Sequence, residues 1–138
     1  MPNIYIDGVF DLFHRGHLES LIKAKNIMDD TFLIVGIVSD FDCSFYKRVP
    51  IINEIDRVEI VKNIKIVDKI IFPCPLKVDM NFIKEHNIDL VVHGFSNEID
   101  REKQKDFYDE IKKNGYFQEI EYYKLTSTTE IINKIKKL

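Results

Sequence analysis

Five short apolar runs divide the chain into segments of strand length. They lie at residues 4–6, 32–38, 67–72, 88–92 and, with weaker character, 120–123. The second and fourth runs are apolar without alternation, which is typical of strands covered by helices on both faces of a parallel sheet. We therefore predict a strand at each of the five runs.

Helical periodicity fills the gaps between these runs. Apolar residues recur there every three or four positions, as they do in helices that bury one face. Such patterns run through residues 18–24, 55–64, 82–86 and 100–114. Asn114 and Gly115 favour the left-handed conformation that closes a helix, so we predict that the fourth helix ends there.

A last helix is predicted at the C-terminal end of the sequence. Thr126 or Ser127 can cap its first turn, because a side-chain oxygen there accepts from the free N–H groups of that turn. Ile131, Ile132 and Ile135 follow at helical spacing, and we expect them to pack inward.

Strands alternating with helices predict an α/β fold. We expect a Rossmann-like, doubly wound, five-stranded parallel sheet with helices on both faces and a ligand site at the carboxyl ends of the strands. The length of 138 residues suits one core, so we predict a single domain over residues 1–138.

Composition narrows the classes of partner. Of the residues, 45% are hydrophobic and 31% charged, with a net charge of -3, which argues against a general nucleic-acid surface. The longest apolar run, 32–38, is too short to cross a membrane, and no signal-type segment is evident, so we expect a cytoplasmic protein without membrane insertion. Cys43 and Cys74 lack the spacing of a zinc site, and we expect both as reduced thiols.

The turn after the first predicted strand carries the candidate chemistry. Residues 7–17 read DGVFDLFHRGH and lead directly into the first amphipathic helix, whose free N–H groups and positive dipole end favour anions. His14 and His17 are three positions apart and project from one side of its first turn, with Gly16 between them allowing a close approach. Both imidazoles could donate to one phosphate.

Other roles for these residues remain open at this point. The two histidines could bind a metal, although zinc normally takes a further protein ligand, or one could cap the helix while the other packs. Arg57 could pair with Glu54 on one helix face, and His93 at a strand end could be a core residue. Lys47 could be a solvated loop cation, as most lysines are.

The eleven residues from Asp7 to His17 resemble the HxGH signature of the cytidylyltransferases that activate phosphocholine, phosphoethanolamine and glycerol 3-phosphate. Five further segments extend the resemblance over nearly the whole chain. The sequence YKRVP at 46–50 resembles the lysine loop of that family, and Glu54 with Arg57 resembles its Glu-x-x-Arg helix. The remaining matches are the strand entries at 67–69 and 88–94 and the Ser-Thr-Thr of residues 127–129.

The resemblance implies a reaction and a set of residues. A nucleoside triphosphate, CTP, would react with a phosphorylated alcohol, with Mg²⁺ bound mainly by the triphosphate and no metal ligand from the chain. It also implies a homodimer, with Lys65 and Asp68 as candidate interface residues. The implied catalytic residues are His14, His17 and Lys47. The implied nucleotide-binding residues are Gly8, Val9, Phe10, Asp11, His14, His17, His93, Lys124, Ser127, Thr128 and Thr129. The implied acceptor-binding residues are Asp11, Lys47, Arg57 and Leu76.

The sequence departs from this family in two places. Before Ser127 the family has an arginine and a glycine, whereas here Lys124 supplies a point charge without a bidentate fork and Leu125 replaces the glycine. Leu76 stands near the position of a tryptophan, and Gly94 with Phe95 replaces an acidic pair.

These departures leave several interpretations open. The acceptor could be phosphocholine, phosphoethanolamine, an aminophosphonate or glycerol phosphate, and Tyr46, Phe95 or Tyr108 could offer an aromatic face to a cation. An adenylyltransferase of the same superfamily and a catalytically weak nucleotide-binding module are the alternative functions.

Overall fold

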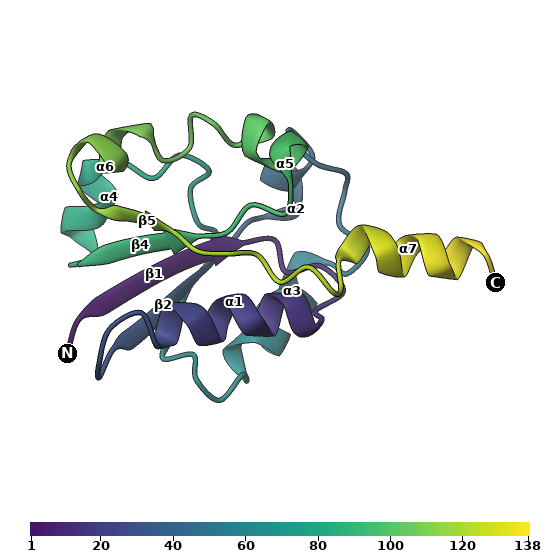
Figure 1. Cartoon of the computed structure of the whole chain (residues 1–138), viewed down its shortest axis with the longest axis horizontal. Coiled ribbons are helices and arrows are strands. Elements are labelled where there is room, and N and C mark those ends of the chain that lie inside the picture. The colour runs from purple at the N-terminus through teal and green to yellow at the C-terminus, as the bar shows by residue number, and fades with distance from the viewer.

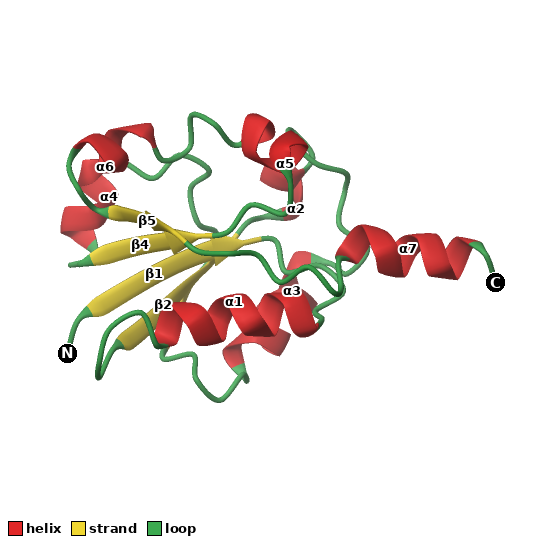
Figure 2. Cartoon of the chain, viewed as in Figure 1, coloured by secondary structure: helices red, strands yellow, loops and turns green.

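An all-parallel sheet forms the centre of the computed structural model, which describes residues 1–138 (Figures 1 and 2). Its five strands lie in the order β3-β2-β1-β4-β5. The strands are β1 Asn3–Gly8, β2 Phe32–Ile37, β3 Lys69–Ile71, β4 Leu90–His93 and β5 Phe117–Glu119. This order reverses direction between β1 and β4, which confirms the doubly wound fold and places a crevice at the carboxyl ends of these two strands.

Six helices connect the strands, and a seventh follows the last strand (Figure 1). They are α1 Arg15–Lys25, α2 Asp40–Cys43, α3 Glu54–Lys62, α4 Met80–Glu85, α5 Glu98–Lys103, α6 Asp109–Lys113 and α7 Thr128–Lys136. None of them is both long and apolar enough to cross a lipid bilayer.

Two hydrophobic clusters cover the two faces of the sheet. On one face, Ile6 of β1 packs with Leu21 of α1 and Val61 of α3. On the other, Tyr5 of β1 packs with Phe82 of α4, in a cluster that also includes residues of α6. Neighbouring residues of a strand point to opposite faces, so burial of both faces explains the unbroken apolar runs.

The last predicted strand is misplaced by several residues. β5 occupies Phe117–Glu119 and pairs with β4 through Val91 and Phe117, whereas residues 121–123 lie outside the sheet. β4 ends at His93, whose carbonyl oxygen accepts from the N–H of Ile120. The prediction of a strand at 120–123 is therefore wrong, because no partner strand continues beside those residues.

The helix predicted over residues 100–114 is also wrong, because the structure has two short helices there. α5 ends at Lys103, and α6 begins at Asp109. Between them, the carbonyl oxygen of Phe107 accepts from the N–H of Val78 at 2.9 Å. A continuous helix would use that carbonyl for its own ladder, so this tertiary bond favours the break.

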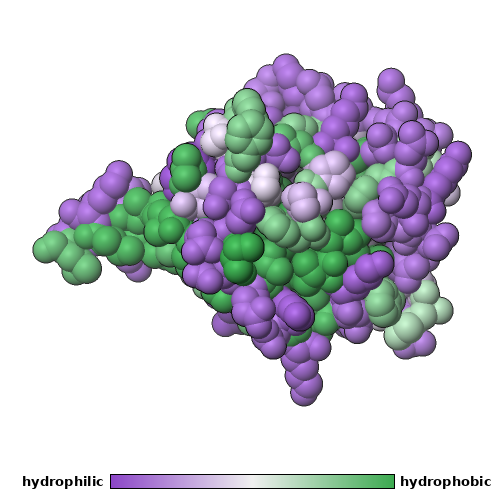
Figure 3. Space-filling view, turned by 180° about the vertical axis from the view of Figure 1, so that it is seen from behind, coloured by the Kyte–Doolittle hydropathy of each residue, from purple (hydrophilic) through white to green (hydrophobic).

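Helix α7 extends away from the rest of the molecule (Figure 1), contrary to our expectation that its isoleucines pack inward. It contains no buried residue, and the exposed fraction of Ile135 is 57%. Figure 3 shows apolar side chains along this projection. Its first residue, Thr128, is hydrogen-bonded to His14 and to the carbonyl oxygen of Asp11 in the turn between β1 and α1.

Candidate active site

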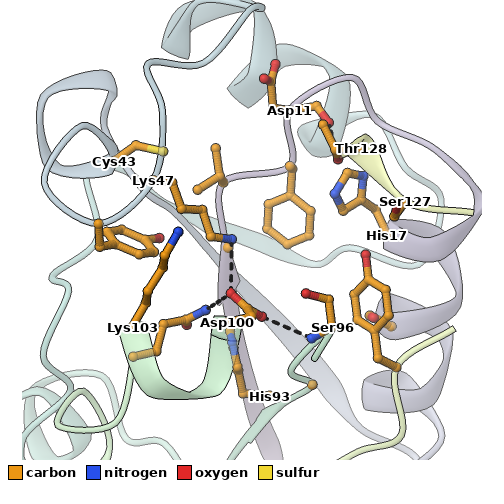
Figure 4. Close-up of a pocket in the computed structure, with 18 of the residues that line it drawn as sticks. Asp11, His17, Cys43, Lys47, His93, Ser96, Asp100, Lys103, Ser127 and Thr128 are labelled. Carbon is orange, nitrogen blue, oxygen red and sulfur yellow. Dashed lines mark hydrogen bonds and ion pairs between the residues drawn. The ribbon is translucent and has the colours of Figure 1, made fainter. Parts of the chain in front are cut away.

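A cleft of about 440 Å³ opens at the carboxyl ends of β1 and β4 (Figure 4). Four segments supply most of its lining: the end of β1 with the turn into α1, residues 43–50 from the end of α2 onwards, residues 93–104 from β4 into α5, and the beginning of α7. Tyr122 adds a single side chain. The cleft lies where the order of the strands reverses, which is the usual ligand position in such sheets.

The turn between β1 and α1 has an unusual backbone that other segments hold in place. Phe10 and Leu12 have positive φ angles of 57° and 50°. Such a conformation costs a non-glycine residue about 1–3 kcal/mol and persists where surrounding structure determines it. The carboxylate of Asp11 accepts from the N–H groups of Ile51 and Ile52 at 2.8 and 2.9 Å and ties this turn to the segment before α3.

His14 and His17 cap the N-terminus of α1 reciprocally. The Nδ1 of His14 accepts from the N–H of Gly16 at 2.9 Å, and the Nδ1 of His17 accepts from the N–H of His14 at 3.2 Å. A Cβ on Gly16 would lie 2.7 Å from the His14 ring, so this packing requires glycine. In each ring Nδ1 is the acceptor, and therefore the proton of the neutral imidazole is on Nε2.

Both histidines remain neutral donors at physiological pH. Burial, followed by the nearby charges of His14 and Lys47, lowers the pKa of His17 to about 3. Burial also lowers the pKa of His14, and the charge of Glu130 opposes that shift only in part. The Nε2–H groups thus act as neutral hydrogen-bond donors rather than as proton sources.

The N-terminus of α7 meets the histidine turn. The Nε2–H of His14 donates to Oγ1 of Thr128 at 3.1 Å, and the hydroxyl of Thr128 donates to the carbonyl oxygen of Asp11 at 3.3 Å. Ser127 is the N-cap, and its hydroxyl oxygen accepts from the N–H of Glu130. The first N–H groups of α7 therefore lie at the cleft, where an anion can satisfy them.

Lys47 enters the cleft from the wall opposite His17 (Figure 4). Its Nζ lies 3.6 Å from Oδ1 of Asp100, whose other oxygen accepts from the N–H of Ser96 at 3.0 Å. Gln104 Nε2 donates to Oδ1 of Asp100 at 2.7 Å. Burial alone would raise the pKa of Asp100, but Lys47 and these two donors lower it below its ordinary value, so the carboxylate is charged.

A buried hydrogen-bonded group forms the floor of the cleft. The hydroxyl of Tyr108 donates to Oδ1 of Asp7 at 2.7 Å, and His93 Nδ1 lies 3.1 Å from the same oxygen. Burial, followed by the charge of Asp7, raises the pKa of Tyr108 well above its ordinary value, so the phenol keeps its proton. This group fixes the carboxyl end of β1 against that of β4.

Most of the predicted nucleotide-binding and catalytic residues line this one cleft. The lining includes Gly8, Val9, Phe10, Asp11, His17, Lys47, His93, Ser127, Thr128 and Thr129, and His14 adjoins it through its contact with Thr128.

Three predicted site residues lie elsewhere. Arg57 is fully buried, and its guanidinium donates to the carbonyl oxygens of Val9, Val38 and Ile52 and to Asp40, so it has no free face for an acceptor. Leu76 packs against the small hydrophobic cluster around Val9 and Val38. Lys124 is exposed and does not line the cleft.

The structure adds cleft residues that sequence reasoning missed. Asp100, Lys103 and Gln104 line the cleft from α5 and its C-cap, and Asp7 and Tyr122 also face it. Asp7 directly precedes the motif glycine at the end of a predicted strand, and this position could have identified it as a cleft residue. No such signal marked the residues of α5, because one long helix was predicted over the region where the structure has two short helices.

The arrangement suits a ligand rich in phosphate. Neutral N–H donors from His17 and from the start of α7 face the cationic Lys47 across a cleft that has water-accessible space between them (Figure 4). Donors fixed in advance by caps and helix termini stabilise developing negative charge with little reorganisation.

The comparisons with protein-family models and with curated proteins agree on one family. Residues 5–134 match the family model described as cytidylyltransferase-like. Choline-phosphate cytidylyltransferase A of Rattus norvegicus is 36% identical over 132 residues, which cover 96% of this chain and 36% of that protein. The probable ethanolamine-phosphate cytidylyltransferase of Encephalitozoon cuniculi is 32% identical over 135 residues, which cover 98% of this chain and 41% of that protein. The chain thus spans less than half the length of these relatives.

A solved structure shares the fold. A lipopolysaccharide core biosynthesis protein from Thermoplasma volcanium superposes with a TM-score of 0.68 at 23% identity, covering 91% of this chain and 99% of the other.

Proposed function

The chain belongs to the cytidylyltransferase-like family, and we propose that it transfers CMP from CTP to a phosphorylated alcohol and releases pyrophosphate. One observation carries the proposal. Neutral histidine donors, the N-terminus of α7 and the ammonium group of Lys47 face a single cleft. Each of these groups binds phosphate, and together they can hold two phosphate-bearing substrates.

The reaction requires little acid–base chemistry from the protein. A phosphate oxygen of the acceptor attacks the α-phosphorus of CTP and forms a new P–O bond. The bond between the α-phosphorus and its bridging oxygen to the β-phosphate breaks, and the electron pair leaves with pyrophosphate. The attacking group is already an anion near pH 7, so the main task is to bring two anions together in line.

The proposed roles follow from the positions of the residues. His17, with its Nε2–H unpaired in the structure, donates to the phosphate that gains charge during the reaction. His14 holds Thr128 and so positions the N-terminus of α7 against the triphosphate. Lys47 neutralises repulsion between the α-phosphate and the incoming phosphate.

Magnesium forms part of the proposal as a companion of the nucleotide. The structure contains no group of three or more His, Cys, Asp or Glu side chains able to hold a metal ion. Mg²⁺ prefers phosphate oxygens and water together with few protein ligands, so we propose that it enters on the triphosphate. When bound there, it would neutralise part of the phosphate charge.

A homodimer is the proposed assembly, as the resemblance implies. Lys65 is exposed and free to take part in an interface. Asp68 already binds its own chain, because it accepts from Lys25 Nζ at 2.7 Å and from the N–H of Leu33 at 2.8 Å. We therefore assign contact with a second copy to Lys65 and a supporting role to Asp68.

Pyrophosphate release tests the proposed reaction. The purified chain is incubated with Mg²⁺ and either CTP or ATP, each with phosphoethanolamine, phosphocholine or glycerol 3-phosphate. We expect release with CTP and an acceptor, and its near loss in Lys47→Met but not in Lys113→Met, which changes an exposed lysine outside the cleft. Release with ATP and an acceptor, but not with CTP, would support an adenylyltransferase instead. No release with any combination of nucleotide and acceptor would contradict the proposal.

A further inference from the structure

Three positively charged side chains line the cleft, and they differ in what holds them. The ammonium group of Lys47 lies 3.6 Å from the carboxylate of Asp100. Lys103 is exposed and belongs to no ion pair. Arg48 is 44% exposed, and one nitrogen of its guanidinium lies 3.6 Å from the carboxylate of Asp11. The proposed function uses only the first of these three charges.

The carboxylate of Asp11 does not depend on Arg48. Its two oxygens already accept from the N–H groups of Ile51 and Ile52, at 2.8 and 2.9 Å. The 3.6 Å to the guanidinium is longer than a hydrogen bond, and the side-chain N–H groups of Arg48 donate to no other group of the chain. A ligand can therefore recruit this guanidinium while Asp11 keeps both of its hydrogen bonds.

Lys47 and Arg48 are neighbours in the sequence but extend to different sides of the cleft. Lys47 reaches Asp100 of α5, whereas Arg48 reaches Asp11 of the turn between β1 and α1. The carbonyl oxygen of this same Asp11 accepts from the hydroxyl of Thr128 at 3.3 Å, and Figure 4 shows the two residues close together. Arg48 is therefore the cleft cation that shares a contact residue with the N-terminus of α7.

The other polar side chains of the cleft do not offer an equivalent group. Tyr122 is half-buried, and burial raises the pKa of its phenol, so this side chain carries no charge. Lys103 is a point charge that lies apart from Thr128, on the other side of Lys47 (Figure 4). Arg48 is the only guanidinium of the lining. Its planar fork can hold two phosphate oxygens at once, which an ammonium group cannot do.

We propose that Arg48 binds the β- and γ-phosphates of the nucleoside triphosphate through two parallel N–H bonds, together with the first N–H groups of α7. Arg48 lies in the lysine loop, where the resemblance implied a role only for Lys47. The identity of the ligand rests on the proposed function, but the contact can be measured without turnover. The β- and γ-phosphates leave together as pyrophosphate, so Arg48 holds the leaving group and transfers no proton.

A binding experiment tests this inference first. CTP and CMP differ in the β- and γ-phosphates, so calorimetric titration with each, in the presence of Mg²⁺, measures what those phosphates contribute. We expect Arg48→Met to bind CTP about ten- to a hundredfold more weakly than the native protein, the range of a charge-assisted hydrogen bond, and to bind CMP unchanged. Equal loss of affinity for both nucleotides would indicate a merely structural role and overturn the inference.

Three further variants separate the fork from charge alone. Arg48→Lys keeps the charge and should recover only part of the affinity for CTP, whereas full recovery would overturn the proposed pair of bonds. Lys113→Met removes an equal charge from an exposed position outside the cleft and should leave CTP binding unchanged. Lys103→Met should weaken CTP binding less than Arg48→Met, and a larger loss would contradict the assignment. Each variant should melt within a few degrees of the native protein.

Inorganic tripolyphosphate separates failure of this inference from failure of the proposed function. If the chain binds it through Arg48 but releases no pyrophosphate from any nucleotide and acceptor, the proposed function fails and the inference stands. If the native protein and Arg48→Met bind CTP and tripolyphosphate equally, or if neither ligand binds the native protein, the inference fails. Where the chain turns over, Arg48→Met should raise the KM for CTP about ten- to a hundredfold and leave the KM for the acceptor unchanged.

Discussion

The two walls of the cleft are built by different means. The turn wall consists of residues 8–17 and the beginning of α7, and backbone hydrogen bonds and reciprocal caps hold it. The lysine wall consists of residues 46–50 and 96–104, and its central contact is the ion pair between Lys47 and Asp100. The first wall is held by hydrogen bonds between its own segments, whereas the central contact of the second joins two charged side chains that line the cleft.

This difference separates two tasks of the site. Donors that stabilise developing charge act best when they are held rigidly, which the turn wall provides. We propose that the Lys47–Asp100 pair of the lysine wall responds instead to the ligand, because a phosphate that binds Lys47 competes with Asp100 for the same ammonium group. Substitutions in the turn wall should therefore affect all substrates alike, and those in the lysine wall should discriminate among them.

The largest expected effect concerns the support of the turn wall. Arg57 is fully buried and donates to the carbonyl oxygen of Val9 at 2.6 Å and to Asp40 at 2.7 Å. Arg57→Met leaves these acceptors without a donor, so we expect a loss of about 3–5 kcal/mol in the free energy of unfolding. Urea denaturation measures this loss.

Arg15→Met is the control for that substitution. Arg15 is exposed and pairs with Glu19 on the same helix, so we expect a change below about 1 kcal/mol. If the two variants unfold at the same urea concentration, the turn wall does not depend on the buried guanidinium.

The second effect concerns catalysis by the turn wall. His17→Leu removes a preorganised neutral donor and should lower kcat by about 10²–10³-fold, the typical result of losing one such donor. The loss should be similar for every acceptor, because in the proposed reaction His17 donates to a phosphate of the nucleotide, which all acceptors share. His86→Leu, which changes a histidine outside the cleft, should leave kcat unchanged. An acceptor-dependent loss in His17→Leu would contradict the division between the walls.

The turn wall is also the part of the cleft whose lining residues the sequence predicted well, while their roles in binding and catalysis stay predictions. The motif at residues 7–17 keeps its chemistry close together in the chain, so strand, turn, caps and donors follow from local rules. The parallel sheet was predictable for a related reason, since burial of both faces produces unbroken apolar runs.

The lysine wall was much less predictable, because tertiary contacts determine it. Asp100 of α5 contacts Lys47, which lies in a segment far away in the sequence, and α5 itself ends before the carbonyl oxygen of Phe107 accepts from the N–H of Val78. Arg57 looked like a ligand residue by its motif, yet its donors are used by backbone carbonyls distant in the sequence. Helical periodicity likewise predicted inward packing for Ile135, although α7 has no core to pack against.

The third effect is the pH dependence of stability. The pKa of His17 is about 3 in the folded protein, mainly through burial, against an ordinary value of 6.5. Between these values the unfolded chain binds a proton that the folded protein does not. The free energy of unfolding should therefore fall as the pH decreases from about 6.5 towards 3, by at most about 1.4 kcal/mol per pH unit from this group.

His17→Gln tests the origin of that slope. Urea denaturation at several pH values between 7 and 4 should show a shallower decline for the variant than for the native protein. Identical slopes would mean that the turn wall does not hold His17 neutral.

The smallest effect concerns the contact between the turn wall and α7. Ser127→Ala removes the side-chain cap of α7, which costs about 1 kcal/mol of helix stability. α7 has nine residues and none is buried, so its folding is only weakly coupled to that of the sheet. We expect faster amide exchange within α7, nearly unchanged global unfolding, and about fivefold weaker CTP binding, because the first N–H groups of the helix are less well ordered. A full loss of about 1 kcal/mol in global stability with unchanged CTP affinity would instead make α7 part of the core and remove it from the nucleotide site.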